Sequence, residues 1–387
     1  MFSCQKPLFS LPRGLHYLNC AYMAPMARPV EEAGIEGIRR KRNPSAIGPA
    51  DFFAESERVR SLFGRLIHSD PSAVALIPSA SYGIAAIASN LVVERGDRIV
   101  VLEEQFPSNV YAWRRVAEET GASVVTVGPR RGGAGRAADW NEQILEAIDR
   151  QTAVVAMPNV HWTDGTRFDL VEISARAREV GAALVVDGTQ SVGALPFDVR
   201  DVQPDALICA GYKWLLGPYA IGLAYFSERH HGGRPLEENW IARRHSERFS
   251  GLVAYEDRYQ PGAVRYDVGE RSNFILLPMM AAALELVLHW GPPSIQSYCQ
   301  ALMRPLIDEA EELGFQIETP TGRGHHLMGL RVSDGTDLER LRLALAQHNV
   351  SLSMRGSAVR ISPHVYNDEQ DVEALIDALH AAATAAR

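Results

Sequence analysis

Seven short runs of apolar, often β-branched residues recur through the first two-thirds of the chain, and segments with helical periodicity separate most of them. The runs lie at residues 73–77, 98–102, 123–127, 153–157, 183–186, 206–209 and 221–226. The helical segments lie at 82–92, 109–119, 141–149 and 170–180. Apolar strands that alternate with helices are typical of a mainly parallel sheet covered on both faces. The sequence therefore predicts an α/β fold with one large seven-stranded domain.

The pattern changes after about residue 228. Glycine, proline and charged residues without periodicity predict a long irregular connection up to about 273. A smaller α/β unit is then predicted. Its helices are expected at 275–290, at 294–313 and from about 368, and its short strands near 326–332, 350–354 and 358–362. Because 387 residues exceed what one core usually serves, we expect two domains. They are a large domain (28–260) and a small C-terminal domain (261–387), with a turn-rich N-terminal segment (1–27) as a candidate to complete the latter.

Composition and charge argue against several classes of partner. The net charge of -8 is unfavourable for nucleic acid binding, which needs a basic surface. No apolar run approaches the roughly 20 residues of a membrane helix, and the N-terminus lacks the apolar core of a secretory signal. The cysteines are far apart, which favours neither a disulfide framework nor a metal site: Cys4, Cys20, Cys209 and Cys299. We therefore expect a cytoplasmic protein with no metal, no membrane and no nucleic acid partner.

Ligands of open parallel sheets bind beyond the carboxyl ends of the strands, so the residues that follow each apolar run are the candidates for a site. Ser79, Ala80 and Ser81 follow the first run and would begin a helix, where backbone N–H groups bind anions. A serine is also a common helix cap without any ligand. Phe106 follows the second run, and either packs in the loop or lies against a planar cofactor. The glycine-rich loop 130–136 lacks the Gly-Lys-Ser/Thr of a phosphate loop and is expected to be a surface turn.

Two further strand ends carry a carboxylate and an amine. Asp187 ends the run in ALVVDGTQSVG (183–193), and Lys213 follows the run in ALICAGYKWLLGP (206–218). Taken alone, Asp187 would be interpreted as a helix cap. A lysine close to a buried strand is expected to have a lowered pKa and to be a nucleophile. A lysine that forms a Schiff base needs a carboxylate to keep the cofactor's ring nitrogen protonated, and successive strands can supply both groups to one pocket.

The stretch from Asp187 to Pro218 resembles the cofactor-binding segment of the class V aminotransferase family of pyridoxal phosphate (PLP) enzymes. The similarity extends from YLNCAYMAP (17–25) to VRISPHVYN (359–367). This family includes cysteine desulfurases, kynureninase, isopenicillin N epimerase and several transaminases. The resemblance implies the type I fold of PLP enzymes, and a homodimer with active sites at its interface.

The resemblance also implies roles for individual residues. Lys213 forms the aldimine (Schiff base) with PLP and then removes the α-proton of a small amino acid. Asp187 pairs with the ring nitrogen, and Gln190 approaches the ring oxygen. Arg360 grips the substrate carboxylate, a task suited to a planar guanidinium. The phosphate is held by the residues of the first strand end, chiefly Ala80 and Ser81.

The chain departs from the family pattern at several positions. Tyr212 replaces the usual histidine before the lysine, as in kynureninase, and is expected to contact phosphate. Ala210 replaces a serine of many desulfurases. Ring stacking is assigned to Phe106. The residue near the ring oxygen is either Trp162 or His161, the latter as a substrate contact, and the sequence leaves the choice open.

Two more departures concern loops. GERS (269–272) replaces the Gly-Thr that usually reaches a neighbour's phosphate, which leaves the roles of Glu270, Arg271 and Ser272 open. The segment SLSMRGSAVR (351–360) has no cysteine, whereas desulfurases carry a thiolate there. A persulfide-forming desulfurase is therefore disfavoured.

These motifs favour a Cβ lyase, such as a C–S lyase, with an aminotransferase next, and then an epimerase, a racemase or a kynureninase-like hydrolase. The substrate pocket is expected to include Tyr22, while Arg243, Arg244 or Arg355 could meet a second acidic group. A nicotinamide dehydrogenase is disfavoured because no G-x-G-x-x-G follows an early strand. A protein that kept the fold only for binding would be expected to lose Lys213, Asp187 or Arg360.

Overall fold

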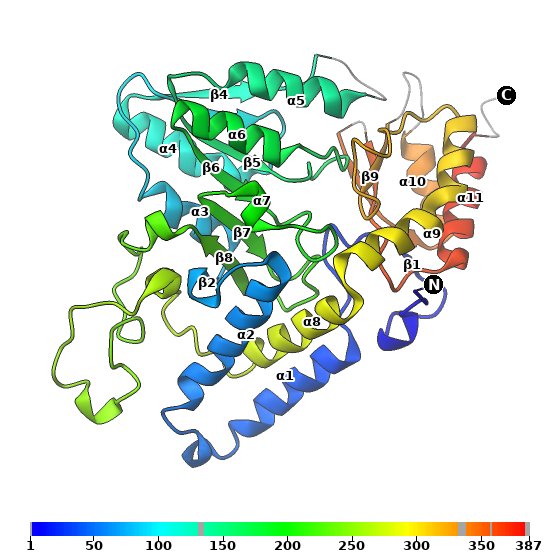
Figure 1. Cartoon of the computed structure of the whole chain (residues 1–387). Coiled ribbons are helices and arrows are strands. Elements are labelled where there is room, and N and C mark those ends of the chain that lie inside the picture. Colours follow the sequence, from blue (N-terminus) through cyan, green and yellow to red (C-terminus); the bar gives the residue numbers. More distant parts are fainter. Residues whose placement is uncertain (1, 131–134, 332–337, 357, 384–387) are drawn as a thin grey trace.

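A seven-stranded sheet forms the centre of the large part of the protein, as the sequence predicts (Figure 1). The computed structural model describes residues 2–130, 135–331, 338–356 and 358–383. The strand order is β2-β8-β7-β6-β5-β3-β4. The strands are β2 (Val74–Ile77), β3 (Arg98–Leu102), β4 (Ser123–Val127), β5 (Thr152–Pro158), β6 (Ala183–Asp187), β7 (Ala206–Ala210) and β8 (Gly222–Phe226). All seven apolar runs are thus strands of one sheet, which confirms the predicted fold class.

The direction of the strands decides where a site can form. β4, β3, β5, β6 and β7 are parallel, whereas β8 is antiparallel to both of its neighbours, β7 and β2. β2 therefore runs in the same direction as β7, although the two are not adjacent. As a result, the segments that follow β2, β3, β5, β6 and β7 all emerge at one edge of the sheet.

Helices cover both faces of the sheet because side chains alternate along each strand. Val100 and Val155 belong to one buried apolar cluster, and their neighbours Ile99 and Val154 belong to another. The helices between the strands are α3 (Ala80–Ala88), α4 (Tyr111–Thr120), α5 (Arg136–Ala147), α6 (Leu170–Val180) and α7 (Val199–Val202). Residues 131–134 of the glycine-rich loop 130–136 lie outside the described residues. α5 begins at Arg136, the last residue of this loop.

Three helices pack side by side below the sheet in Figure 1: α1 (Arg28–Arg40), α2 (Asp51–Ile67) and α8 (Leu276–Trp290), of which α2 contacts β2. α8 is apolar along most of its length and packs against both others, so it joins the core of the large part. A Cβ at Gly37 would collide with the backbone of Phe274, so only glycine permits this close approach.

The C-terminal part has an apolar core of its own, which includes Leu18 from the N-terminal segment. It contains the helices α9 (Pro292–Glu312), α10 (Leu338–Gln347) and α11 (Glu369–Ala383). Its three-stranded antiparallel sheet has the order β11-β12-β9, with β9 (Met328–Arg331), β11 (Ser353–Arg355) and β12 (Ala358–Ile361). β1 (His16–Tyr17) pairs in parallel with β10 (Val350–Ser351). The N-terminal segment thus adds a strand here, while the domain boundaries proposed from the sequence stay predictions.

The segment between β8 and α8 is irregular apart from short 3-10 turns at Glu228–His230, Phe249–Gly251 and Gly262–Tyr266. Part of it loops away from the body of the protein, in yellow-green in Figure 1. Among the described residues, no helix is both long enough and apolar enough to cross a membrane.

Candidate active site

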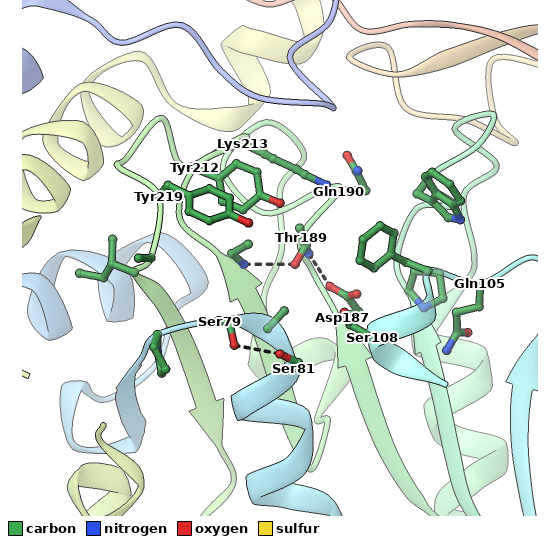
Figure 2. Close-up of a pocket in the computed structure, with 18 of the residues that line it drawn as sticks. Ser79, Ser81, Gln105, Ser108, Asp187, Thr189, Gln190, Tyr212, Lys213 and Tyr219 are labelled. Carbon is green, nitrogen blue, oxygen red and sulfur yellow. Dashed lines mark hydrogen bonds between the residues drawn. The ribbon is translucent and has the colours of Figure 1, made fainter. Parts of the chain in front are cut away.

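A cavity of about 240 Å³ lies at the carboxyl edge of the sheet (Figure 2). Loops after β2, β3, β5, β6 and β7 contribute to its wall, as the strand directions require. Each residue that the sequence assigned to the cofactor lines this cavity: Ser79, Ala80, Ser81, Phe106, Trp162, Asp187, Gln190, Tyr212 and Lys213. Tyr219, Thr189 and Gln105 also line it, and none of the three was predicted as a site residue. The fold therefore brings together residues that span more than 130 positions of the chain.

Lys213 is a buried amine with no strong partner. Its side chain is only 6% exposed, and Nζ lies 5.5 Å from the ring centre of Phe106 and 5.6 Å from that of Tyr212. Within the part of the chain that the structure describes, Nζ forms no hydrogen bond or ion pair. Burial lowers the pKa of Lys213 to about 8, although Asp187 opposes the shift. The chain has just two other lysines, Lys6 and Lys41, and neither is buried.

The loop after Lys213 adopts a costly backbone conformation. Leu216 and Ala220 have φ angles of 57° and 65°, in the left-handed region that disfavours residues with a side chain. Such strain of about 1–3 kcal/mol per residue is concentrated at functional sites. The surrounding fold therefore holds the 213–221 loop in a defined shape at the cavity wall.

The lowered pKa of Lys213 predicts a pH dependence for cofactor loading. A lysine attacks an aldehyde only as the neutral amine, and this form becomes dominant once the pH exceeds about 8 rather than the ordinary 10.5. We expect the rate of PLP incorporation into cofactor-free protein to rise with pH and to level off with a midpoint near 8. The increase in visible absorbance after mixing, followed between pH 6.5 and 10, measures this rate. A midpoint above pH 10 would contradict the burial of this amine.

Asp187 ends β6 beneath the lysine. Its Oδ1 accepts a hydrogen bond of 3.0 Å from the backbone N–H of Thr189, whose hydroxyl in turn accepts one of 3.1 Å from the N–H of Ala210 (Figure 2). The side chain is buried, which raises its carboxyl pKa. A cation placed in the cavity would stabilise the ionised carboxylate, because nearby opposite charge favours the charged form.

The N-terminus of α3 faces the same cavity. Ser79 caps this helix by accepting a hydrogen bond of 3.2 Å from the N–H of Tyr82, and its hydroxyl lies 2.9 Å from that of Ser81 (Figure 2). Tyr212 and Tyr219 also line the cavity and pack together, with ring centres 4.5 Å apart. Free N–H groups at a helix N-terminus attract a phosphate. The capping role and the anion-binding role of these serines are therefore compatible.

Gln190 is held by contacts on both ends of its amide. Nε2 donates a hydrogen bond of 3.1 Å to the backbone oxygen of Ala21, and Oε1 accepts one of 3.0 Å from the indole of Trp214. The backbone oxygen of Gln190 also lies 2.9 Å from Nε2 of His326. One hydrogen of Nε2 stays free for a ligand, so a role as donor to a ring oxygen remains a prediction.

The structure separates the two residues that the sequence left as alternatives. Trp162 lies on the cavity wall, with its ring centre 5.4 Å from that of Phe106. His161 is fully buried behind the wall, and its nitrogens lie 2.7 Å from the hydroxyl of Thr163 and 3.1 Å from the backbone oxygen of Glu103. This geometry disagrees with a substrate-binding role for His161, because both ring nitrogens already have partners.

Arg360 and Tyr22, the other predicted substrate contacts, do not line the cavity itself. Arg360, on β12, is 1% exposed, and its Nη1 donates a hydrogen bond of 2.9 Å to the backbone oxygen of Trp162. Its buried Nε has no partner among the residues that the structure describes, and burial lowers the pKa of Arg360 to about 10. Tyr22 is 55% exposed. Both roles stay predictions.

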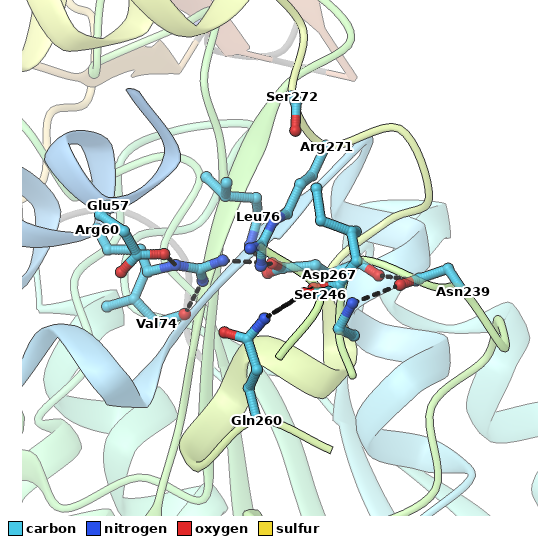
Figure 3. A network of polar contacts seen from close by, with 12 residues as sticks. Glu57, Arg60, Val74, Leu76, Asn239, Ser246, Gln260, Asp267, Arg271 and Ser272 are labelled. Carbon is cyan, nitrogen blue, oxygen red and sulfur yellow. Dashed lines mark hydrogen bonds and ion pairs between the residues drawn. The ribbon is translucent and has the colours of Figure 1, made fainter. Parts of the chain in front are cut away.

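Arg271, one of the residues whose role was open, belongs to a buried polar network (Figure 3). It forms an ion pair with Asp267, which also pairs with Arg60 on α2. Asp267 accepts a hydrogen bond of 2.8 Å from the N–H of Leu76 on β2. The network thus ties the 267–272 segment to the strand that leads into the helix N-terminus at the cavity. Ser272 donates a hydrogen bond of 2.5 Å to the backbone oxygen of Phe52.

The site fits PLP on its own geometry. A buried amine without a partner, a buried carboxylate and a helix N-terminus face one cavity, and aromatic rings line it. These are the groups that an aldehyde, a protonated ring nitrogen and a phosphate each require. Together with the sheet order, they define an enzyme of the type I fold that uses PLP.

Comparisons with known proteins agree with this class. The family model described as Aminotransferase class-V matches residues 49–375. The uncharacterized aminotransferase YcbU of Bacillus subtilis (strain 168) is 28% identical over 328 residues, which is 84% of each chain. Isopenicillin N epimerase of Streptomyces clavuligerus is 26% identical and covers 91% of this chain and 92% of its own length.

The solved apo structure of a cysteine desulfurase from Thermococcus onnurineus NA1 has the same fold. Its TM-score is 0.79 at 20% identity, and the match covers 97% of both chains. The chain therefore belongs to the class-V aminotransferase family, and it is a PLP-dependent enzyme. The resemblance that the sequence motifs indicated is confirmed, and so is the predicted cofactor.

Proposed function

We propose that this protein cleaves or transfers groups of a small α-amino acid, with Lys213 as the base, and that it is a Cβ lyase of the C–S type. The position of Lys213 and Asp187 in one buried cavity carries the proposal. PLP, when bound, draws electrons away from the bonds of the substrate's Cα. A lysine whose pKa is near 8 can accept the Cα proton close to neutral pH.

The other residues have supporting roles in this proposal. Asp187 supplies negative charge beside the ring nitrogen, and Arg360 binds the α-carboxylate. Phe106 is proposed to stack against the cofactor ring, and Trp162 packs beside it in the cavity wall. Each role follows from a side chain that is buried or that lines the cavity.

A desulfurase that stores sulfur as a persulfide is not proposed. The sequence has no cysteine between 351 and 360, and Cys20, Cys209 and Cys299 are buried. Burial raises the pKa of Cys20 to about 12, so its thiol stays protonated and unreactive at neutral pH. An aminotransferase is the second candidate, because the relative YcbU carries that description.

Product analysis distinguishes these reactions. The PLP-loaded enzyme is incubated with S-substituted L-cysteines, and separately with L-amino acids together with a 2-oxo acid. We expect pyruvate, ammonia and the thiol in equal amounts from the cysteine derivatives. Amino transfer to the 2-oxo acid without release of ammonia would instead establish the aminotransferase, and a change of configuration alone would establish an epimerase.

We also propose that the protein is a homodimer. The support is the exposure of apolar side chains on the segment that loops away from the body, where Val253 is 87% and Tyr255 is 95% exposed. Burial of such side chains against a second copy would be favourable. Sedimentation velocity should give the mass of two chains, and a monomer at micromolar concentration would contradict the proposal.

A further inference from the structure

Two arginines lie against one ring at the edge of the active site. Arg355 and Arg360 come from the neighbouring strands β11 and β12 of the C-terminal part. Their guanidinium carbons lie 5.5 Å and 6.0 Å from the ring centre of Trp162, which lines the cavity. The hairpin therefore presents two positive charges to the part of the cavity wall that Trp162 forms.

Neither charge is neutralised by a carboxylate among the residues that the structure describes. Arg360 is bonded to the backbone oxygen of Trp162, and its buried Nε has no partner. Arg355 is partly buried and is bonded only to the backbone oxygen of Met354, at 2.9 Å. The two are close enough for Arg355 to contribute to the lowered pKa of Arg360, and both contribute to that of Lys213. Like charges in such a setting are unfavourable unless an anion joins them.

One α-carboxylate accepts the two parallel hydrogen bonds of one guanidinium group. In the proposed function Arg360 takes that carboxylate, which leaves Arg355 without a counter-charge. We infer that the preferred substrate carries a second anionic group on its side chain, and that Arg355 binds it. This inference rests on the proposed function and specifies its substrate class as an α-amino acid with an anionic side chain.

The other arginines that the sequence offered for this role have partners of their own. Arg243 forms an ion pair with Glu238 and a hydrogen bond to the backbone oxygen of Asp257. Arg244 donates a hydrogen bond of 3.2 Å to the backbone oxygen of Tyr259 and is exposed. None of the three arginines lines the cavity itself. Of the three, only Arg355 lies against Trp162 in the cavity wall, and it does so without an ion pair among the described residues.

The test compares amino acids of matched shape that differ in side-chain charge. L-Glutamate is paired with L-glutamine and L-aspartate with L-asparagine, and each dissociation constant is measured from the change in the visible absorption of the PLP-loaded enzyme. We expect at least one acidic ligand to bind about tenfold or more tightly than its amide, a difference of about 1.4 kcal/mol. In Arg355→Gln this preference should largely disappear, while binding of the amides changes by less than about twofold.

Three further variants serve as controls. Arg360→Gln should weaken acidic and neutral ligands alike, because it removes the contact to the α-carboxylate. Arg342→Gln removes one charge from the exposed ion pair with Glu339 on α10. It should change the dissociation constants of neither the acidic ligands nor their amides. Arg355→Lys, which keeps the charge but loses the planar fork, should retain part of the preference.

Other outcomes would overturn the inference. If Arg355→Gln weakens acidic and neutral ligands equally, both arginines grip a single carboxylate. If the wild-type enzyme binds each acidic ligand no more tightly than its amide, the preferred substrate does not carry a second anionic group. If no amino acid changes the absorption of the loaded enzyme, the proposed function itself fails. This outcome differs from the two above, in which amino acids bind and only the inference about Arg355 fails.

Discussion

Replacing Lys213 with alanine is expected to abolish the covalent link to PLP and to reduce turnover by about a thousandfold or more, the usual contribution of a positioned base. The wild-type protein should show a visible absorption band that borohydride removes, and peptide mapping should then find the reduced adduct on Lys213. In the variant, borohydride should fix no PLP to the protein. The measurement is unusually clear here, because only three lysines exist in the chain.

Lys41→Ala is the matched control, since Lys41 is exposed beyond the end of α1. It should retain the band, the adduct and full activity. An adduct on Lys6 or Lys41 in the wild-type protein, or retained activity in Lys213→Ala, would remove the basis of the proposed mechanism.

Replacing Asp187 with alanine should lower kcat by about a thousandfold, or about 4 kcal/mol of activation free energy. The physical reason is the loss of the one buried carboxylate that can hold a ring nitrogen in its protonated form. Steady-state kinetics with the best substrate from the product analysis measures this effect. A loss of less than about tenfold would mean that Asp187 serves only as a hydrogen-bond acceptor.

Asp187→Asn separates the two roles. Asparagine still accepts the 3.0 Å hydrogen bond from the N–H of Thr189, but it cannot carry a negative charge. This variant should therefore be nearly as inactive as the alanine variant while remaining folded. Asp169→Asn is the control, because Asp169 also accepts a hydrogen bond from a nearby backbone N–H, that of Glu172 at 3.1 Å, as the cap of α6. Asparagine and aspartate are nearly equal caps, so the control should be active.

Much of the fold could be predicted from local patterns. The seven apolar runs became the seven strands, and the helices at 275–290 and 294–313 appear with ends that differ by one or two residues. α1 and α2 were not identified: α1 buries only Val30, Gly34 and Gly37 and shows a weak apolar pattern, whereas the apolar spacing of α2 was missed. The antiparallel direction of β8 was also beyond local reasoning, since a short apolar strand looks the same in either direction.

The sequence by itself indicated the cofactor-binding candidates at the cavity, because each follows a strand of a largely parallel sheet and such ends share one edge. Only the tertiary structure decided which way the side chains point. Adjacent residues such as His161 and Trp162 differ by one position in the chain, yet one is buried behind the wall and the other lines the cavity. It likewise distinguished Arg355 from Arg243 and Arg244, because only the fold brings the guanidinium of Arg355 against the ring of Trp162 in the cavity wall.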